Sequence, residues 1–271
     1  MKSRGAMKSR GAMKSRGAMK SRGMTLWKLE WIRLFRTKRW IALLGVYVFF
    51  GLVGPLTARY ISEILESFGG GVQVVVLEPV AADGITSYVS NAAQIGLLVS
   101  VGIAAAALAF DAKPQMGIFL RTRVSPIRGI IWPRYLVVTA AVTAAFALGS
   151  VAALYESTVL MGSLPFGGWL LGTLLGCLYL AFAVAVVAAV ASKTQSVLVA
   201  VVVAVGVLLL LPIIGIAPEI GEWLPSHLVG AIDSLVRGGG FSDYVGATAV
   251  TIVLIAGALG LAVRWAEQRE L

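Results

Sequence analysis

The chain has 271 residues, of which 58% are hydrophobic and only 13% are charged, and its mean hydropathy is +0.88. A soluble domain is roughly half apolar and about a quarter charged, so this composition argues against a soluble globular enzyme. The chain is nevertheless basic, with 23 Lys and Arg residues against 13 Asp and Glu residues. The single cysteine, Cys177, excludes an intrachain disulfide, and the single histidine, His227, leaves no His/Cys cluster for a metal.

The first 23 residues repeat a short basic motif, with MKSRGA three times followed by MKSRG. Each copy has no apolar side chain beyond Met and Ala, so residues 1–23 are expected to be disordered. One interpretation is a basic arm that touches anionic lipid. The favoured interpretation is a coding-repeat or start-site artefact, with Met24 as the natural first residue. The segment has no apolar core and is not expected to be a signal peptide.

Six later segments are long and apolar enough to cross a bilayer, which takes about 20 apolar residues in a helix. They cover approximately residues 40–56, 91–110, 130–154, 169–191, 197–216 and 244–263. We therefore predict an all-α membrane protein in which residues 24–271 form a single domain of six transmembrane helices.

The distribution of charge predicts the orientation of these spans. With both termini in the cytoplasm, 21 of the 23 basic residues lie on the cytoplasmic side and nine of the 13 acidic residues lie outside. Cytoplasmic loops retain Lys and Arg, so this arrangement is the favoured one. Without the repeat, 13 of 15 basic residues remain inside. We expect a multi-pass protein of the plasma membrane with cytoplasmic N- and C-termini.

Residues 24–39 precede the first span and combine aromatic with basic side chains. Four apolar residues have the spacing i, i+4, i+7 and i+8 that places them on one helical face: Trp27, Trp31, Leu34 and Phe35. Glu30, Arg33 and Arg36 are expected on the opposite face. This pattern is typical of a helix that lies in the cytoplasmic membrane interface; the alternative is a merely basic membrane-proximal stretch.

Two of the segments between spans are predicted to contain short helices. The cytoplasmic loop 111–129 is basic and rich in proline, and residues 116–124 can form a brief helix that docks on a soluble partner. The alternative is an ordinary positively charged cytoplasmic loop. On the outer side, residues 217–244 are too polar to span but contain apolar runs. They are expected to form a re-entrant or surface-lying helical segment, with an ordinary external loop as the alternative.

Motifs for chemistry within the chain are missing from the sequence. There is no G-x-x-x-x-G-K-[ST] loop, no Ser/His pair at one membrane depth, and no ionisable residue expected deep in a span. We therefore predict no catalytic residue, no metal site and no cofactor in this chain.

Small residues recur at helical spacing in the spans. This spacing predicts close helix-packing contacts at Gly96, Ser100, Gly168, Gly172 and Gly176. Spans of this kind suit a lipophilic or amphipathic cargo.

The order of these elements resembles the ABC-2 family of membrane subunits of ATP-binding-cassette exporters. The resemblance covers nearly all of residues 24–271 and rests on WKLEWIRLFRTKRW before the first span, GIFLRTRVSPIRGIIWPRY between spans two and three, and the helical segment outside between spans five and six. It implies an elbow helix at residues 24–39 and a coupling helix in the loop 111–129, both contacting an ATPase subunit. The implied coupling residues are Met116, Phe119, Leu120, Arg121, Thr122 and Arg123.

The resemblance further implies the partners and the activity. Two copies of the chain, or one copy and a related subunit, would pair with two cassette ATPase subunits that bind ATP and Mg²⁺. The chain would export a drug, lipid or peptide across the lipid bilayer. The alternatives are a stand-alone secondary transporter or channel and an intramembrane enzyme. The excess of basic residues is then explained by the orientation of the chain in the membrane and by a docking site for the ATPase. No nucleic-acid partner is expected.

Overall fold

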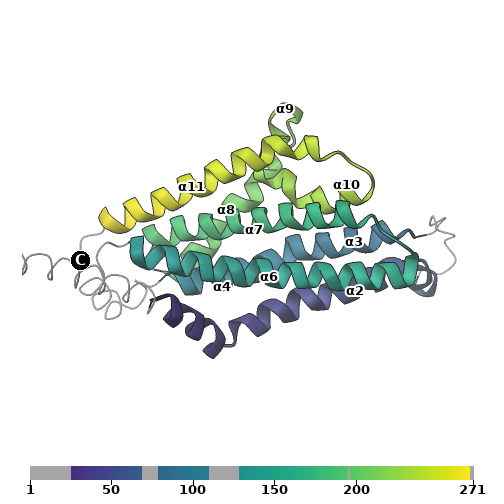
Figure 1. The fold of residues 1–271 in the computed structure, drawn as a ribbon, viewed down its shortest axis with the longest axis horizontal. Helices are drawn as coiled ribbons and strands as arrows, with labels where there is room; N and C mark the ends of the chain where they lie inside the picture. The colour runs from purple at the N-terminus through teal and green to yellow at the C-terminus, as the bar shows by residue number, and fades with distance from the viewer. Residues whose placement is uncertain (1–25, 69–78, 110–127, 195, 269–271) are drawn as a thin grey trace, which may run out of the picture.

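A computed structural model of the chain describes residues 26–68, 79–109, 128–194 and 196–268, and these residues form a bundle of long helices (Figure 1). A helix at residues 26–36 comes first. The further elements are α2 (Arg39–Phe68), α3 (Ala81–Asn91), η1 (Ala92–Gly96), α4 (Leu97–Leu108), α6 (Arg128–Met161), α7 (Phe166–Lys193), α8 (Val197–Ile214), α9 (Pro218–Gly221), η3 (Pro225–Gly230), α10 (Ala231–Val236), η4 (Phe241–Tyr244) and α11 (Val245–Gln268).

Six helices in the described part of the chain are long and apolar enough to cross a membrane. They are formed by α2, by α3 to α4, by α6, by α7, by α8, and by η4 with α11. No strand occurs in the described ranges. The prediction of an all-α protein with six spans is therefore confirmed at this level, and the architecture is that of a multi-pass membrane protein.

The second span differs from its predicted bounds. We expected it to begin near Asn91, but the helix begins at Ala81 and reaches Leu108. The added residues, AADGITSYVSN, include Asp83, and polar residues at this density suggested a loop. They are helical because Ile85, Tyr88 and Val89 are buried on one face while the Asp83 carboxylate accepts a hydrogen bond from the Val80 N–H at the helix start (2.9 Å).

The helix at residues 26–36 meets α2 at a sharp turn, and the two form a V at one end of the bundle (Figure 1). Lys38 makes the turn with φ of 54°, a left-handed conformation that is uncommon outside glycine. Aromatic rings continue across it, with Phe35 stacked near Trp31 (centroids 6.0 Å apart) and edge-on to Trp40 (5.9 Å). A helix is therefore present where the interfacial helix was expected, and its position in a membrane stays a prediction.

Helix α7 lies at the centre of the bundle. It packs against α4, α6, α8, α10, η3 and α11, and most of its residues are buried. The second major contact joins α2 to α6, where a Cβ on Gly149 would come within 2.5 Å of the Tyr47 carbonyl oxygen. A Cβ on Gly51 would likewise meet the Gly149 carbonyl. The two glycines thus let the α2 and α6 backbones approach closely.

The segment between α8 and α11 packs into the bundle. Leu228, Ala231 and Ile232 are buried almost completely, and α10 contacts both α7 and α3. The contact with α7 depends on two glycines: a Cβ on Gly168 would meet the Leu235 carbonyl, and a Cβ on Gly172 would meet the Ile232 backbone. The helical nature of part of this segment agrees with expectation, whereas its re-entrant or surface-lying position stays a prediction.

We predict that Gly172→Ala lowers the stability of the bundle. The added Cβ meets the Ile232 backbone, which cannot rotate away as a side chain can, so overpacking should cost about 1–3 kcal/mol. The measurement is the thermal unfolding midpoint of the purified protein in detergent. Gly167→Ala on the same helix is the matched control, because nothing lies within 4 Å of its Cβ position. Equal midpoints for the two variants would contradict this close contact.

Candidate functional site

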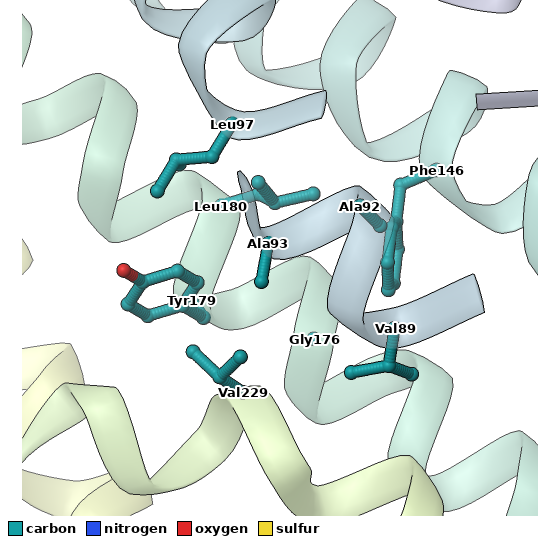
Figure 2. Close-up of a pocket in the computed structure, with 9 residues that line it drawn as sticks. All are labelled: Val89, Ala92, Ala93, Leu97, Phe146, Gly176, Tyr179, Leu180 and Val229. Carbon is teal, nitrogen blue, oxygen red and sulfur yellow. The ribbon is translucent and has the colours of Figure 1, made fainter. Parts of the chain in front are cut away.

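An apolar pocket lies between the second span, α6, α7 and η3 (Figure 2). Its nine lining residues are Val89, Ala92, Ala93, Leu97, Phe146, Gly176, Tyr179, Leu180 and Val229. The hydroxyl of Tyr179 is the single polar group among their side chains. The pocket has a free volume of about 20 Å³, roughly the room that one water molecule needs, so binding of a larger apolar molecule would require the pocket to widen.

The pocket lies beside a break in the regular α-helix of the second span. Residues Ala92–Gly96 form one π-helical turn between α3 and α4, and Ala92 and Ala93 from this turn line the pocket. π-Turns occur frequently at functional sites, because the extra residue disturbs the regular hydrogen bonding of the helix. This turn and the pocket coincide in the structure.

Hydrogen bonds and aromatic contacts fix the pocket wall at Phe146. The Tyr88 hydroxyl donates to the Phe146 carbonyl (2.7 Å), and the two rings are stacked with centroids 5.7 Å apart. Tyr47 from α2 packs edge-on against the same ring, and its hydroxyl pairs with the Ser100 hydroxyl (2.9 Å). Three spans, α2, the second span and α6, are therefore joined at Phe146.

The pocket lies near the middle of the bundle along its length. Its lining residues on the second span lie eight (Val89) to sixteen (Leu97) residues after the start of α3, and those on α7 lie ten (Gly176) to fourteen (Leu180) residues after the start of α7. These positions correspond to about 12–24 Å from the end where α10 packs, at 1.5 Å per residue.

An ion-pair cluster joins α10 to the start of α3 and is here named the outer latch, because the sequence predicts that this end of the bundle faces outward. It consists of Asp83, Thr86, Asp233 and Arg237. The Arg237 guanidinium donates from Nη2 to Asp83 Oδ1 (2.7 Å) and from Nε to Asp233 Oδ1 (2.8 Å). The Thr86 hydroxyl donates to the Asp233 carboxylate and accepts from Arg237 Nη2. The latch thus holds together two segments that each continue into the pocket wall.

The charge state of the latch follows from its contacts. Hydrogen bonds from Arg237 to Asp83 and then to Asp233 raise the pKa of Arg237 above its ordinary value, so it remains cationic. Because these side chains are between 31% and 42% exposed, each pair contributes modestly, of the order of 0.2–1 kcal/mol. The latch is therefore a weak attachment.

A second ion pair lies at the opposite end of the bundle. Arg134 on α6 is only 5% exposed and donates from Nε to Glu30 Oε1 of the helix 26–36 (2.7 Å). Arg33 approaches the same carboxylate at 3.8 Å. The sequence pattern had placed Glu30 and Arg33 opposite an apolar face that included Leu34. In the structure Leu34 is buried in the bundle beside them, because the ion pair turns this face of the helix toward α6.

The other predicted residues divide into three groups. Trp27, Trp31 and Phe35 are exposed on the first helix, as a lipid-facing position requires. The small residues lie at helix contacts: Gly96 and Ser100 meet Tyr47, Gly168 and Gly172 meet α10, and Gly176 meets the Phe146 ring. The predicted coupling residues, Met116, Phe119, Leu120, Arg121, Thr122 and Arg123, lie outside the described residues.

Sequence reasoning missed the pocket, the outer latch and the pairing of Arg134. No local pattern links Asp83 to Arg237, which are 154 positions apart. One feature of the sequence could have indicated the ion pair. Arg237 is one of only two basic residues in the predicted outer loops, which are otherwise rich in acidic residues. Within the described ranges, no three His, Cys, Asp or Glu side chains are grouped to hold a metal ion.

Comparison with known proteins identifies no relative. No family model, no curated protein and no solved structure matches the chain. Functional assignment therefore depends on the residues and their arrangement in this structure.

We predict that Arg237→Gln loosens α10 while leaving the bundle folded. Losing both ion pairs should cost about 1 kcal/mol, equivalent to a roughly fivefold larger equilibrium constant for local opening. Hydrogen exchange of the amides in η3 and α10 measures this directly. The control is Arg264→Gln, which makes the same charge change at an exposed site on α11. Exchange that is equal in the two variants would show that the latch does not restrain α10.

Proposed function

We propose that this chain is the membrane-spanning permease subunit of an ABC exporter. It would move a lipophilic or amphipathic substrate, such as a drug, lipid or peptide, out of the cell. Separately encoded cassette ATPase subunits, which bind ATP and Mg²⁺, would supply the energy. A second copy of the chain or a related subunit would complete the membrane part, and the protein would reside in the plasma membrane with both termini in the cytoplasm.

The observation that carries the proposal is the order of the elements. A short helix turns sharply into the first of six spans, a basic loop joins spans two and three, and a buried helical segment separates spans five and six. This is the order in the ABC-2 family that the sequence resembles. The six helices alone would fit many membrane proteins, so the support comes from the two additional helical parts and their positions.

The contact between Glu30 and Arg134 supports a mechanical role for the cytoplasmic end. Arg134 lies in the second turn of α6, close after the loop 111–129, and Glu30 belongs to the proposed elbow helix. A buried ion pair therefore joins the proposed elbow helix to the first turns of the helix that follows the loop. Movement of the loop would displace α6 and the elbow helix together as one rigid unit.

Helix α6 also reaches the pocket. It runs without interruption from Arg128 past Phe146, and Phe146 holds Tyr88 of α3 by a hydrogen bond and a stacked ring. We propose that displacement of α6 on ATP binding shifts Phe146 and widens the pocket. Separation of α10 from α3 at the outer latch would then open the pocket to the outside.

This function can be tested by reconstitution. We predict that the chain co-purifies with a cassette ATPase and that vesicles containing both export a lipophilic dye only with ATP. Phe119→Ala should lower the ATP-driven rate at least about tenfold, because it removes the apolar side chain of the proposed coupling helix. The paired control is Phe241→Ala on the outer side, which cannot touch the ATPase.

Two results would count against the proposal. Transport that proceeds without an ATPase would indicate a stand-alone transporter or channel. Unchanged ATP-driven transport in Phe119→Ala and in Arg121→Ala would remove the loop from the coupling mechanism.

We also predict that filling the pocket blocks transport. Ala93→Leu adds three carbons to the pocket wall and should reduce the export rate of a lipophilic dye about tenfold or more. Ala256→Leu makes the same change on an exposed face of α11 and should leave the rate unchanged. Binding of the ATPase should be equal in both variants, which separates loss of substrate from loss of coupling. Equal export rates would place the substrate elsewhere.

A further inference from the structure

A second pocket lies at the cytoplasmic end of the bundle, and its lining is partly cationic. It is enclosed by the helix 26–36, the start of α2, α4 and α6. The lining residues are Glu30, Arg33, Leu34, Thr37, Arg39, Ile103, Ala107, Arg134, Val137 and Val138. The pocket therefore combines a charged side with an apolar side formed by the spans.

The described charges around this pocket do not balance. Arg33 and Arg39 contribute two guanidinium groups, and the Glu30 carboxylate, which accepts from Arg134 at 2.7 Å, lies 3.8 Å from Arg33. Among the described residues, no carboxylate forms an ion pair with Arg39, and the like charges of Arg33 and Arg39 line the same pocket. The left-handed Lys38 makes the turn that brings these two side chains to one pocket.

Repulsion between Arg33 and Arg39 is relieved when an anion lies between them. Guanidinium groups bind phosphate oxygens with paired, charge-assisted hydrogen bonds. The Thr37 hydroxyl donates its proton to the Arg33 carbonyl (2.8 Å), so the donors left for an anion on this side are the two guanidinium groups. The polar side of the pocket therefore suits one phosphate group.

The surroundings indicate that this phosphate is carried by a lipid. The pocket lies where α2 and the third span begin and where α4 ends, which would be the headgroup level of a bilayer crossed by these helices. Ile103, Ala107 and Val137 provide an apolar wall below it. Trp31, Ile32 and Phe35 are exposed on the other side of the helix 26–36, and tryptophan is favoured at the membrane interface.

We propose that this pocket binds the phosphate headgroup of an anionic phospholipid. Arg33 and Arg39 hold the phosphate, and the acyl chains follow the apolar wall toward the membrane core. The bound lipid bridges the helix 26–36 and the spans, and it complements the Glu30–Arg134 ion pair. The site is independent of ATP and of any transport activity.

The test is native mass spectrometry of the full chain in detergent, with phosphatidylglycerol added in increasing amounts. Wild type should retain one more tightly bound phosphatidylglycerol than the double variant Arg33→Gln/Arg39→Gln, with an affinity difference of at least about tenfold. The matched control is Arg128→Gln/Arg264→Gln, which removes two exposed cytoplasmic charges outside the pocket and should bind as wild type does. Residues 1–23 are present in all proteins, so their charges do not affect the comparison.

Further arms distinguish the sources of the anion. Phosphatidylcholine should not be retained at this site, and millimolar inorganic phosphate should not displace phosphatidylglycerol. Displacement by inorganic phosphate would overturn the lipid assignment, and equal retention of phosphatidylcholine would overturn recognition of net charge. Equal retention of phosphatidylglycerol by the double variant and wild type would overturn the site itself.

A pair of variants at one position distinguishes loss of the lipid site from misfolding of the protein. Arg39→Lys keeps the positive charge and should retain most of the binding, whereas Arg39→Gln should lose it. Unfolding midpoints measured without added lipid should agree within this pair. Loss of binding in Arg39→Lys equal to that in Arg39→Gln would contradict recognition by charge.

Discussion

The glycine face of α7 is the constraint on which the rest of the structure depends. Gly168 and Gly172 let the α10 backbone lie directly against the α7 backbone, so that η3 and α10, within the segment between spans five and six, are largely covered by protein. Exposed irregular backbone is strongly unfavourable in lipid, because no water satisfies its N–H and carbonyl groups. Once α10 occupies this position, η3 completes the pocket wall at Val229 and Arg237 reaches Asp83.

In the described bundle, two kinds of polar interaction occur in different places. Hydroxyl groups bond helices within the spans, as in the contact of Tyr47 with Ser100 and in the buried group of Ser150, Thr173 and Trp169. Ion pairs between described residues lie at the two ends, where Glu30 meets Arg134 and where Arg237 meets two aspartates. Interhelical hydroxyl bonds contribute roughly 0.6–2 kcal/mol each in a membrane. Neutral hydrogen bonds therefore join the spans to one another, whereas ion pairs join the spans to the helix 26–36 and to α10.

The number of spans was predictable because membrane length imposes a strong and local requirement on the sequence. The helix at residues 26–36 was also predictable from its aromatic spacing. The start of the second span was not, because Asp83 and its polar neighbours resemble a loop until their partners on α10 are known. The burial of Arg134 was hidden for the same reason, since in sequence it belongs to a run of cytoplasmic positive charges. The π-turn at Ala92–Gly96 has no proline or other local signal, and the pocket beside it depends on four separate elements.

The π-turn also determines how the two halves of the second span are oriented. One additional residue in a helix rotates everything beyond it by about 100° relative to an uninterrupted α-helix. The last residue of the turn, Gly96, and Ser100 beyond it contact Tyr47, while the half before the turn presents Asp83 and Thr86 to α10. Deletion of a single residue from the turn would restore a regular helix and place these two sets of contacts out of phase. The second span therefore has two contact surfaces, one on each side of the π-turn. With one residue fewer at the turn, the span could not contact α2 and α10 at the same time.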